Sequence, residues 1–205
     1  MSPPEPAVAA TGASIAEAIS AAECEIARAL FVEYATWLAI DLCFQGFGEE
    51  LATLPGAYAR PAGRLFLARV GTDVAGCVAL RPLKSPAMPA VSVALESCGR
   101  PDSTAPRRTA IQGTTESVAP ATACELKRLW VRPGFRGHGL GRALSAGAMR
   151  AAREIGYREM KLDTLAEQMP EAVAMYRSLG FVECAPYYHN PVAGVLYMTC
   201  ALEGS

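Results

Sequence analysis

The chain has 205 residues, of which 51% are hydrophobic, and its formal net charge at pH 7 is −1. This length and composition suffice for one domain with a full hydrophobic core. The sequence contains no run of about 18 apolar residues, so we predict no membrane-spanning helix and no membrane partner. The opening residues lack the basic and apolar regions of a secretory signal, and residues 1–12 are expected to be a disordered tail.

The cysteine and histidine content argues against structural cross-links. The seven cysteines are scattered, odd in number and never spaced as C-x-x-C. This pattern predicts reduced thiols in a cytoplasmic protein, with neither a disulfide framework nor a zinc site. The two histidines, His138 and His189, are too few and too far apart to suggest a metal centre.

The N-terminal half is predicted to contain a helix and a β-hairpin. Ser20-Ala-Ala-Glu23 is a capping box, and the apolar spacing that follows predicts a helix over about 21–40. The pattern leaves open whether residues 13–19 form a strand or extend this helix. A short helix is expected over 46–54, and the β-rich runs 64–70 and 74–80 are expected to pair through Gly71-Thr72-Asp73.

Residues 84–122 are rich in Pro, Ser, Thr, Ala and Gly, with only 91–95 resembling a strand, and are expected to form a long loop or insertion. Further predicted elements, in chain order, are a strand over 124–131, a helix from Leu140 to Gly156, a strand over 160–162, a helix from Pro170 to Gly180, and strands over 181–185 and 195–201. This order predicts a single domain over 13–205, an α/β or α+β sandwich around one central sheet.

The segment between the predicted strand ending at Val131 and the helix starting at Leu140 is the most informative part of the chain. It contains Arg136-Gly-His-Gly-Leu-Gly141, in which three positions lack a side chain. Backbone N–H groups there can approach an anion closely at a helix N-terminus, where the helix dipole also favours negative charge. A phosphate-bearing ligand is therefore predicted.

Charge in the same region supports this prediction. From Leu126 to Arg153 there is no Asp or Glu, whereas Lys and Arg recur throughout. Such a cluster attracts anions, but it is too small and too poor in interleaved aromatic residues to predict nucleic-acid binding. The alternative is a basic helix face that is merely solvated.

Two other phosphate-binding motifs were weighed against the glycine spacing. A Walker A loop is excluded because Leu140 and Gly141 replace its lysine and hydroxyl residue. A dinucleotide-binding fold lacks its third glycine, since Arg142 or Leu144 stands there. Asp163, however, occupies the position of a ribose-binding acid, so this alternative stays open.

Residues 124–200 resemble the GNAT superfamily of acetyl-CoA-dependent N-acetyltransferases. Arg136-Gly-His-Gly-Leu-Gly141 fits the family's [RQ]-x-x-G-x-[GA] loop after its strand and Val-x-Pro turn. Ala172-Val-Ala-Met-Tyr176-Arg-Ser-Leu-Gly180-Phe181 resembles the A-x-x-L-Y-x-x-x-G-F end of the family's later helix. Met169 and Met175 depart from the Asn and Leu that are usual there. The resemblance implies the GNAT acyl-CoA N-acyltransferase fold, with a mixed, mostly antiparallel sheet flanked by helices.

The resemblance also implies the cofactor contacts. The loop amides would bind the pyrophosphate of CoA, with charge from Arg132, Arg136 and Arg142, and the pantetheine would lie along the preceding strand. Backbone N–H groups near Leu129 and Val131 would polarise the thioester carbonyl. The residues implied in cofactor binding are Leu129, Trp130, Val131, Arg136, Gly137, His138, Gly139, Leu140, Gly141 and Arg142. For His138 the spacing requires the backbone rather than the imidazole.

Two residues are implied as catalytic. Glu125 starts the strand beside the cofactor and is the expected general base, directly or through a water; an exposed strand-end Glu is the alternative. Tyr176 is the expected acid for the departing thiolate, with a packed helix tyrosine as the alternative.

The implied function is transfer of an acetyl group from acetyl-CoA to a primary amine of a small molecule or peptide, in a ternary complex and without a metal. The alternatives are a catalytically silent acyl-CoA-binding or sensor module and a nicotinamide-dependent enzyme. The sequence does not identify the acceptor, and it leaves open whether the chain is a homodimer.

Overall fold

The computed structural model describes residues 12–83 and 122–202, which form a seven-stranded sheet in the order β1-β2-β3-β4-β5-β7-β6. The strands are β1 (Ala13–Glu17), β2 (Arg64–Val70), β3 (Asp73–Pro82), β4 (Ala123–Val131), β5 (Glu159–Leu165), β6 (Val182–Glu183) and β7 (Val195–Ala201). Neighbouring strands are antiparallel except for the parallel pair β4 and β5. The predicted mixed, mostly antiparallel sheet is thus confirmed.

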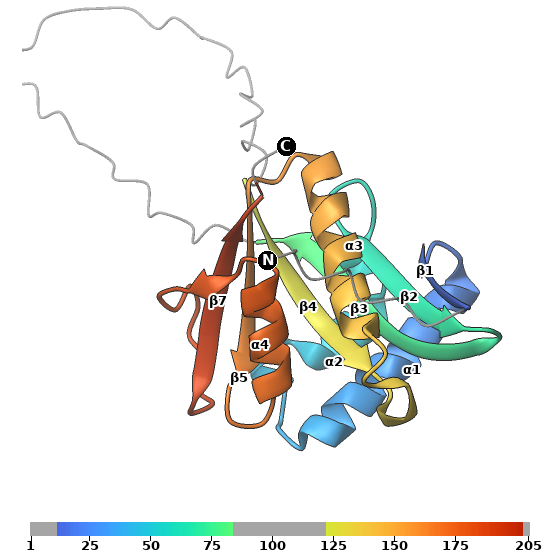
Figure 1. Cartoon of the computed structure of the whole chain (residues 1–205), viewed down its shortest axis with the longest axis horizontal. Coiled ribbons are helices and arrows are strands. Elements are labelled where there is room, and N and C mark those ends of the chain that lie inside the picture. The colour runs from blue at the N-terminus through green and yellow to red at the C-terminus, as the bar shows by residue number, and fades with distance from the viewer. Residues whose placement is uncertain (1–11, 84–121, 203–205) are drawn as a thin grey trace, which may run out of the picture. The chain divides into compact units, whose positions relative to one another are not determined.

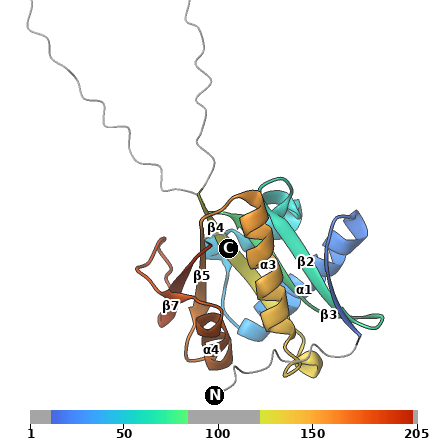
Figure 2. The same ribbon diagram turned by 45° about the horizontal axis from the view of Figure 1, so that its top comes forward.

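The helices cover both faces of this sheet. They are α1 (Ala21–Leu38), α2 (Phe47–Thr53), α3 (Leu140–Ile155) and α4 (Pro170–Ser178), with 3₁₀ turns at Cys43–Gln45, Gly56–Tyr58 and Pro133–Phe135. Figure 1 shows α3 and α4 in front of the sheet and α1 and α2 behind it. In Figure 2, α3 runs across the central strands while α4 stands beside β5 and β7.

Alternating side chains of the strands divide the core into two layers. In β3, Val78 and Leu80 pack toward α3, whereas Cys77 and Ala79 pack toward α1. This alternation follows from the two-residue repeat of an extended strand. Because both faces are covered, β3 is apolar on both sides through its middle. Among the described residues, no helix has the length and apolar character needed to cross a membrane.

The local signals at the helix ends are confirmed. Ser20 Oγ accepts a hydrogen bond from the Glu23 N–H, and the Glu23 carboxylate accepts one from the Ser20 N–H, which completes the capping box before α1. Gly156 ends α3 with a φ angle of 104° and donates its N–H to the carbonyl of Ala152.

Strand lengths differ from the prediction where pairing decides them. Residues 13–17 form strand β1, because they pair with β2 along their whole length. Strand β5 is longer than the predicted 160–162, since β7 pairs with it from Glu159 to Leu165. Strand β6 is shorter than 181–185, because only Val182 and Glu183 pair with β7. The expected tail 1–12 and insertion 84–122, with the strand-like stretch 91–95, lie outside the described residues except for Gly12 and Thr122.

Candidate active site

The loop between β4 and α3 presents free backbone amides at the start of the helix. Gly137 and Gly139 have φ angles of 80° and 74°, a left-handed conformation that glycine adopts without strain. Gly139 is the N-cap of α3 and offers no side chain to cap it. Among the described residues, none accepts a hydrogen bond from the backbone N–H groups of residues 137–142. Free donors at a helix N-terminus give this loop the geometry of an anion-binding site.

Arg136 anchors this loop to the rest of the fold. Its Nε donates to the carbonyl of Val131 at 3.0 Å. Its guanidinium carbon lies 5.0 Å from the ring centre of Trp37 and 4.9 Å from that of Trp130. Such stacking is favourable for a guanidinium and restrains its position. The imidazole of His138 bonds the Arg136 carbonyl at 2.8 Å and is exposed, so it leaves the loop amides free.

Strands β4 and β5 separate beside the loop. Their parallel pairing includes only Ala123 to Glu125 of β4, and Figure 1 shows the two strands diverging beyond that point. The Arg132 N–H donates to the carbonyl of Ala75 in β3. Because successive N–H groups point to opposite edges of a strand, those of Leu129 and Val131 face the gap toward β5. The gap therefore exposes two donors of the kind predicted to polarise a carbonyl.

A bulge in β4 places two consecutive cations on one face of the sheet. The register with β3 shifts between Cys77 and Ala79, so that β4 carries one extra residue, and Arg128 has a φ angle of 56°. An extra residue interrupts the alternation of side chains. Lys127 and Arg128 therefore both point toward the face covered by α1 and α2. No residue type in this stretch predicts the bulge, since arginine does not favour positive φ.

Part of the basic segment predicted to form a positive cluster is paired inside the fold. Three of its members form ion pairs with acidic residues from other elements: Lys127 with Asp163, Arg128 with Glu50, and Arg132 with Glu33. Charge that is segregated along the chain is thus neutralised in space. Arg150 and Arg153 are exposed on α3, as the alternative of a solvated basic helix face predicts.

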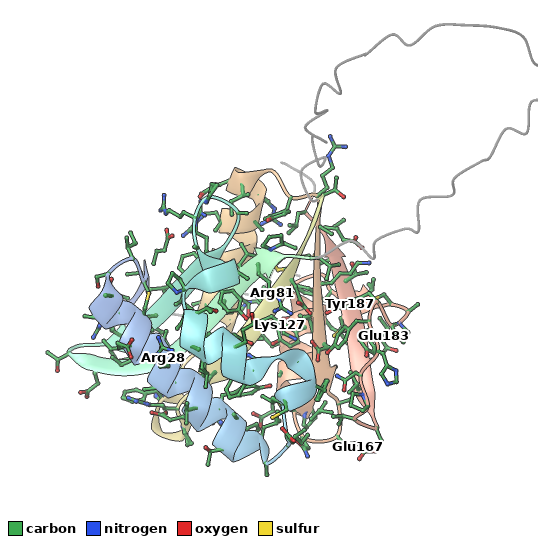
Figure 3. The ribbon with its side chains drawn as sticks, turned by 180° about the vertical axis from the view of Figure 1, so that it is seen from behind. Arg28, Arg81, Lys127, Glu167, Glu183 and Tyr187 are labelled. Carbon is green, nitrogen blue, oxygen red and sulfur yellow. The ribbon has the colours of Figure 1, made fainter. Side chains whose placement is uncertain are left out.

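Glu125 is buried, with 2% of its surface exposed, so the alternative of a solvated strand-end residue is wrong. One carboxylate oxygen accepts a hydrogen bond from Arg81 Nε at 2.8 Å, and the other accepts one from the Tyr187 hydroxyl at 2.9 Å. Lys127 Nζ lies 3.5 Å from the second oxygen. Figure 3 shows Arg81, Lys127 and Tyr187 converging on this region from three different elements.

A second carboxylate, half-buried, belongs to Asp163 of β5. Lys127 Nζ and the Tyr188 hydroxyl each donate to it, at 2.8 and 2.9 Å. Burial alone would raise the pKa of Asp163, but the charge and hydrogen bond of Lys127 lower it below its usual value. The ribose-binding role that the dinucleotide alternative gave to Asp163 is not compatible with these contacts, and the mostly antiparallel sheet excludes that fold.

Tyr176 lies on α4 and is buried, with its ring packed edge-on against Phe181. No described residue bonds its hydroxyl. Burial raises the pKa of this hydroxyl, and nearby Tyr34 and Asp163 raise it further. The hydroxyl is therefore protonated at neutral pH.

A pocket opens on the α1 side of the sheet, between the end of α1, β4, β5 and the loop before β7. Its lining includes Tyr34, Lys127, Arg128 and Asp163. Glu125 and Tyr176 do not line it. Among the described residues, no group of three or more His, Cys, Asp or Glu is placed to hold a metal ion.

Comparison with known proteins identifies the family. Residues 32–181, well over half of the chain, match the family model described as the acetyltransferase (GNAT) family. The chain belongs to the GNAT family. It is therefore an acyltransferase, and its resemblance to this family in the 124–200 segment is confirmed.

Two curated relatives of this GNAT enzyme are uncharacterized N-acetyltransferases. An uncharacterized N-acetyltransferase of Schizosaccharomyces pombe is 34% identical over 172 residues, which cover 83% of each chain. Another, from Dictyostelium discoideum, is 32% identical over 197 residues, covering 80% of this chain and 87% of the relative. The fold is similar to a crystal structure of an acetyltransferase from Streptococcus agalactiae, with a TM-score of 0.62, 18% identity, and coverage of 93% and 98% of the two chains.

The structure brings the predicted cofactor-side residues of this GNAT enzyme together. The loop residues 136–142 and the free edge of β4 adjoin one another, on either side of Val131. Sequence reasoning missed the polar residues on the pocket side, Glu50, Arg128, Asp163 and Gln45. Tyr187 and Tyr188, in the segment before β7, bond the carboxylates of Glu125 and Asp163.

Proposed function

We propose that this enzyme transfers the acetyl group of acetyl-CoA to a primary amine of a small molecule or peptide, by direct attack in a ternary complex. The observation that carries the proposal is the row of unbonded amides at residues 137–142, next to the open edge of β4. Acetyl-CoA offers both a pyrophosphate and a thioester carbonyl, and this arrangement provides donors for each.

On the cofactor side, the amides of residues 137–142 bind the pyrophosphate at the N-terminus of α3. Arg142 stands in the first turn of α3, where it adds positive charge. The N–H groups of Leu129 and Val131 donate to the thioester oxygen, on which negative charge develops during attack. Trp130 lies between these two residues, but its backbone pairs with Cys77 of β3 and its indole packs against α1.

Replacing Gly139 with valine tests the phosphate loop. The φ angle of 74° is strained for a β-branched residue, by roughly 1–3 kcal/mol, so the loop will move and its amides will lose their alignment. We expect the Kd for acetyl-CoA, measured by calorimetry, to rise about thirtyfold. The matched control is Gly134→Val, since Gly134 has no positive φ and open space around it. An unchanged Kd in Gly139→Val would remove the loop from the binding site.

On the acceptor side, the amine must lose a proton before it attacks. For an amine of pKa about 10.4, this costs about 4–5 kcal/mol at pH 7. Glu125 is the proposed base and acts through a water, because both of its oxygens already accept hydrogen bonds. Asp163 is the competing carboxylate, since it lines the pocket and Glu125 does not.

Tyr176 is proposed to protonate the departing thiolate. Replacing it with phenylalanine removes only the hydroxyl, and a thiol of pKa about 8.5 leaves fairly well without help. We therefore expect kcat to fall about tenfold, with the Kd for acetyl-CoA changed less than twofold. The matched control is Tyr157→Phe, whose hydroxyl donates to the carbonyl of Ala62 at 2.8 Å and should affect stability rather than kcat. Unchanged turnover in Tyr176→Phe would exclude the acid role.

The function as a whole is tested by measuring CoA release from acetyl-CoA across a panel of amines, together with calorimetric binding of acetyl-CoA. Release that depends on an amine is the expected result. Binding without release for any amine would favour the silent acyl-CoA sensor, and absence of binding would overturn the assignment of acetyl-CoA.

A further inference from the structure

The pocket on the α1 side combines apolar walls with a small set of polar groups. Leu38, Ile40, Phe44, Leu165 and Val195 are among its apolar lining residues. These side chains come from the end of α1, the segment after it, and strands β5 and β7. Walls of this kind suit the carbon skeleton of a ligand, while a few polar groups fix its orientation.

The charged groups of the pocket do not favour a second cation. Among the described lining residues, the cations are Lys127 and Arg128 and the single carboxylate is Asp163. The carboxylate already accepts a hydrogen bond from Lys127 Nζ at 2.8 Å, and the Lys127 side chain is only 6% exposed. A further ammonium group would have to compete with this buried lysine for Asp163, because the nearby carboxylates of Glu50 and Glu125 already pair with Arg128 and Arg81.

Gln45 presents an unused acceptor in the same pocket. The Tyr188 hydroxyl has one proton, which it donates to the acceptor-only Asp163. Its oxygen must therefore accept hydrogen bonds from Asn190 and from Gln45, whose Nε2 lies 3.3 Å away. This chain of hydrogen bonds fixes the orientation of the Gln45 amide and turns its Oε1 away from Tyr188.

The Gln45 Oε1 is buried, and no described residue donates a hydrogen bond to it. A buried amide oxygen without a donor is costly, so this atom is suited to a ligand that brings an N–H group. Gln45 belongs to the pocket lining, which places this acceptor beside the apolar walls.

Resting on the proposed function, we propose that the acceptor is a monoamine with an apolar body, and that Gln45 Oε1 accepts a hydrogen bond from its amine N–H. Polyamines and other multiply cationic acceptors are then poor substrates. The amine nitrogen forms the new bond to the acetyl carbon, the carbon–sulfur bond breaks, and the amine's proton leaves to the base while the thiolate takes one from the acid.

A matched pair of amines tests the charge argument. Hexylamine and hexamethylenediamine have the same carbon chain and differ by one terminal amine. We expect kcat/KM for hexylamine to exceed that for hexamethylenediamine at least tenfold. Equal or better use of the diamine would overturn the inference while leaving the acetyltransferase assignment intact. Use of a linear triamine, with hexylamine not accepted, would also overturn it.

Variants of Gln45 test the hydrogen bond. Gln45→Met keeps the length of the side chain and removes the acceptor, so the KM for hexylamine should rise about fivefold while kcat and the Kd for acetyl-CoA stay unchanged. Gln45→Glu should lower the ratio of kcat/KM for hexylamine to kcat/KM for hexamethylenediamine. The control is Gln168→Met, because Gln168 is exposed and lies outside the pocket lining. An unchanged KM in Gln45→Met would contradict the role of Gln45. Failure of the wild-type enzyme to bind acetyl-CoA would instead overturn the proposed function.

Discussion

Glu125→Gln will lower kcat/KM at pH 7 by about 10²-fold, the contribution typical of a general base. Glutamine has nearly the same shape but cannot take the amine's proton at this pH. The loss should shrink as pH rises toward the pKa of the acceptor amine, since a deprotonated amine needs no base. Initial rates between pH 7 and 9.5, with the acceptor found in the amine panel, measure this dependence.

Two further variants distinguish a base from a structural residue. Asp163→Asn removes the competing carboxylate, and its loss in kcat/KM should be smaller and independent of pH over the same range. Glu159→Gln is the control, because Glu159 is a carboxylate of the neighbouring strand that bonds Thr199 outside the pocket. The same loss for Glu125→Gln at every pH would show that Glu125 only holds Arg81 and Tyr187 in place.

Glu50→Gln will lower the free energy of unfolding by about 3–5 kcal/mol. Arg128 donates to both oxygens of Glu50, at 2.9 and 2.7 Å, and the side chains are 3% and 9% exposed. Removing the carboxylate leaves the Arg128 guanidinium buried without its counter-charge. For a chain of this size the melting temperature should fall by roughly 10 °C in thermal unfolding. The control is Glu49→Gln, an exposed neighbour on the same helix, which should have almost no effect.

The pH dependence of the stability difference between wild type and Glu50→Gln provides an independent check. Burial alone would raise the pKa of Glu50, but Arg128 lowers it below the usual value of 4.5. A lowered pKa in the folded state means that the ion pair contributes fully above about pH 4.5, and that this contribution is lost as pH falls through the lowered pKa. The stability gap between wild type and Glu50→Gln should therefore narrow below pH 4.5. A gap that stays constant to pH 3 would rule out the ion pair as its source.

The parts of the fold that the sequence predicts well are those encoded locally. The glycines at 137 and 139, the capping box at Ser20 and the glycine that ends α3 each act through neighbouring residues, so their signals lie within a few positions. Strand β7 also matches its predicted range of 195–201. Strand β5 was underestimated because its length depends on a partner more than thirty residues away.

The pocket side of the site depends on contacts between distant segments. Arg128 meets Glu50, which is 78 positions earlier, and Glu125 meets Tyr187, which is 62 positions later. No periodicity or motif connects such pairs. The bulge that turns Lys127 and Arg128 to the same face is equally hidden, since regular alternation would send them to opposite faces. For this reason the sequence predicts a free basic cluster, although three of its cations pair with acidic residues of other elements.

Helix α1 touches both of the proposed binding regions. Trp37 stacks on Arg136 of the phosphate loop, while Tyr34 and Leu38, on the same two turns, line the pocket. A helix moves as a rigid rod over such a short length, so a shift that tightens one region is felt in the other. Acetyl-CoA and the acceptor would therefore both contact α1. Thermodynamic linkage requires that any effect of one ligand on the affinity for the other is equal in both directions.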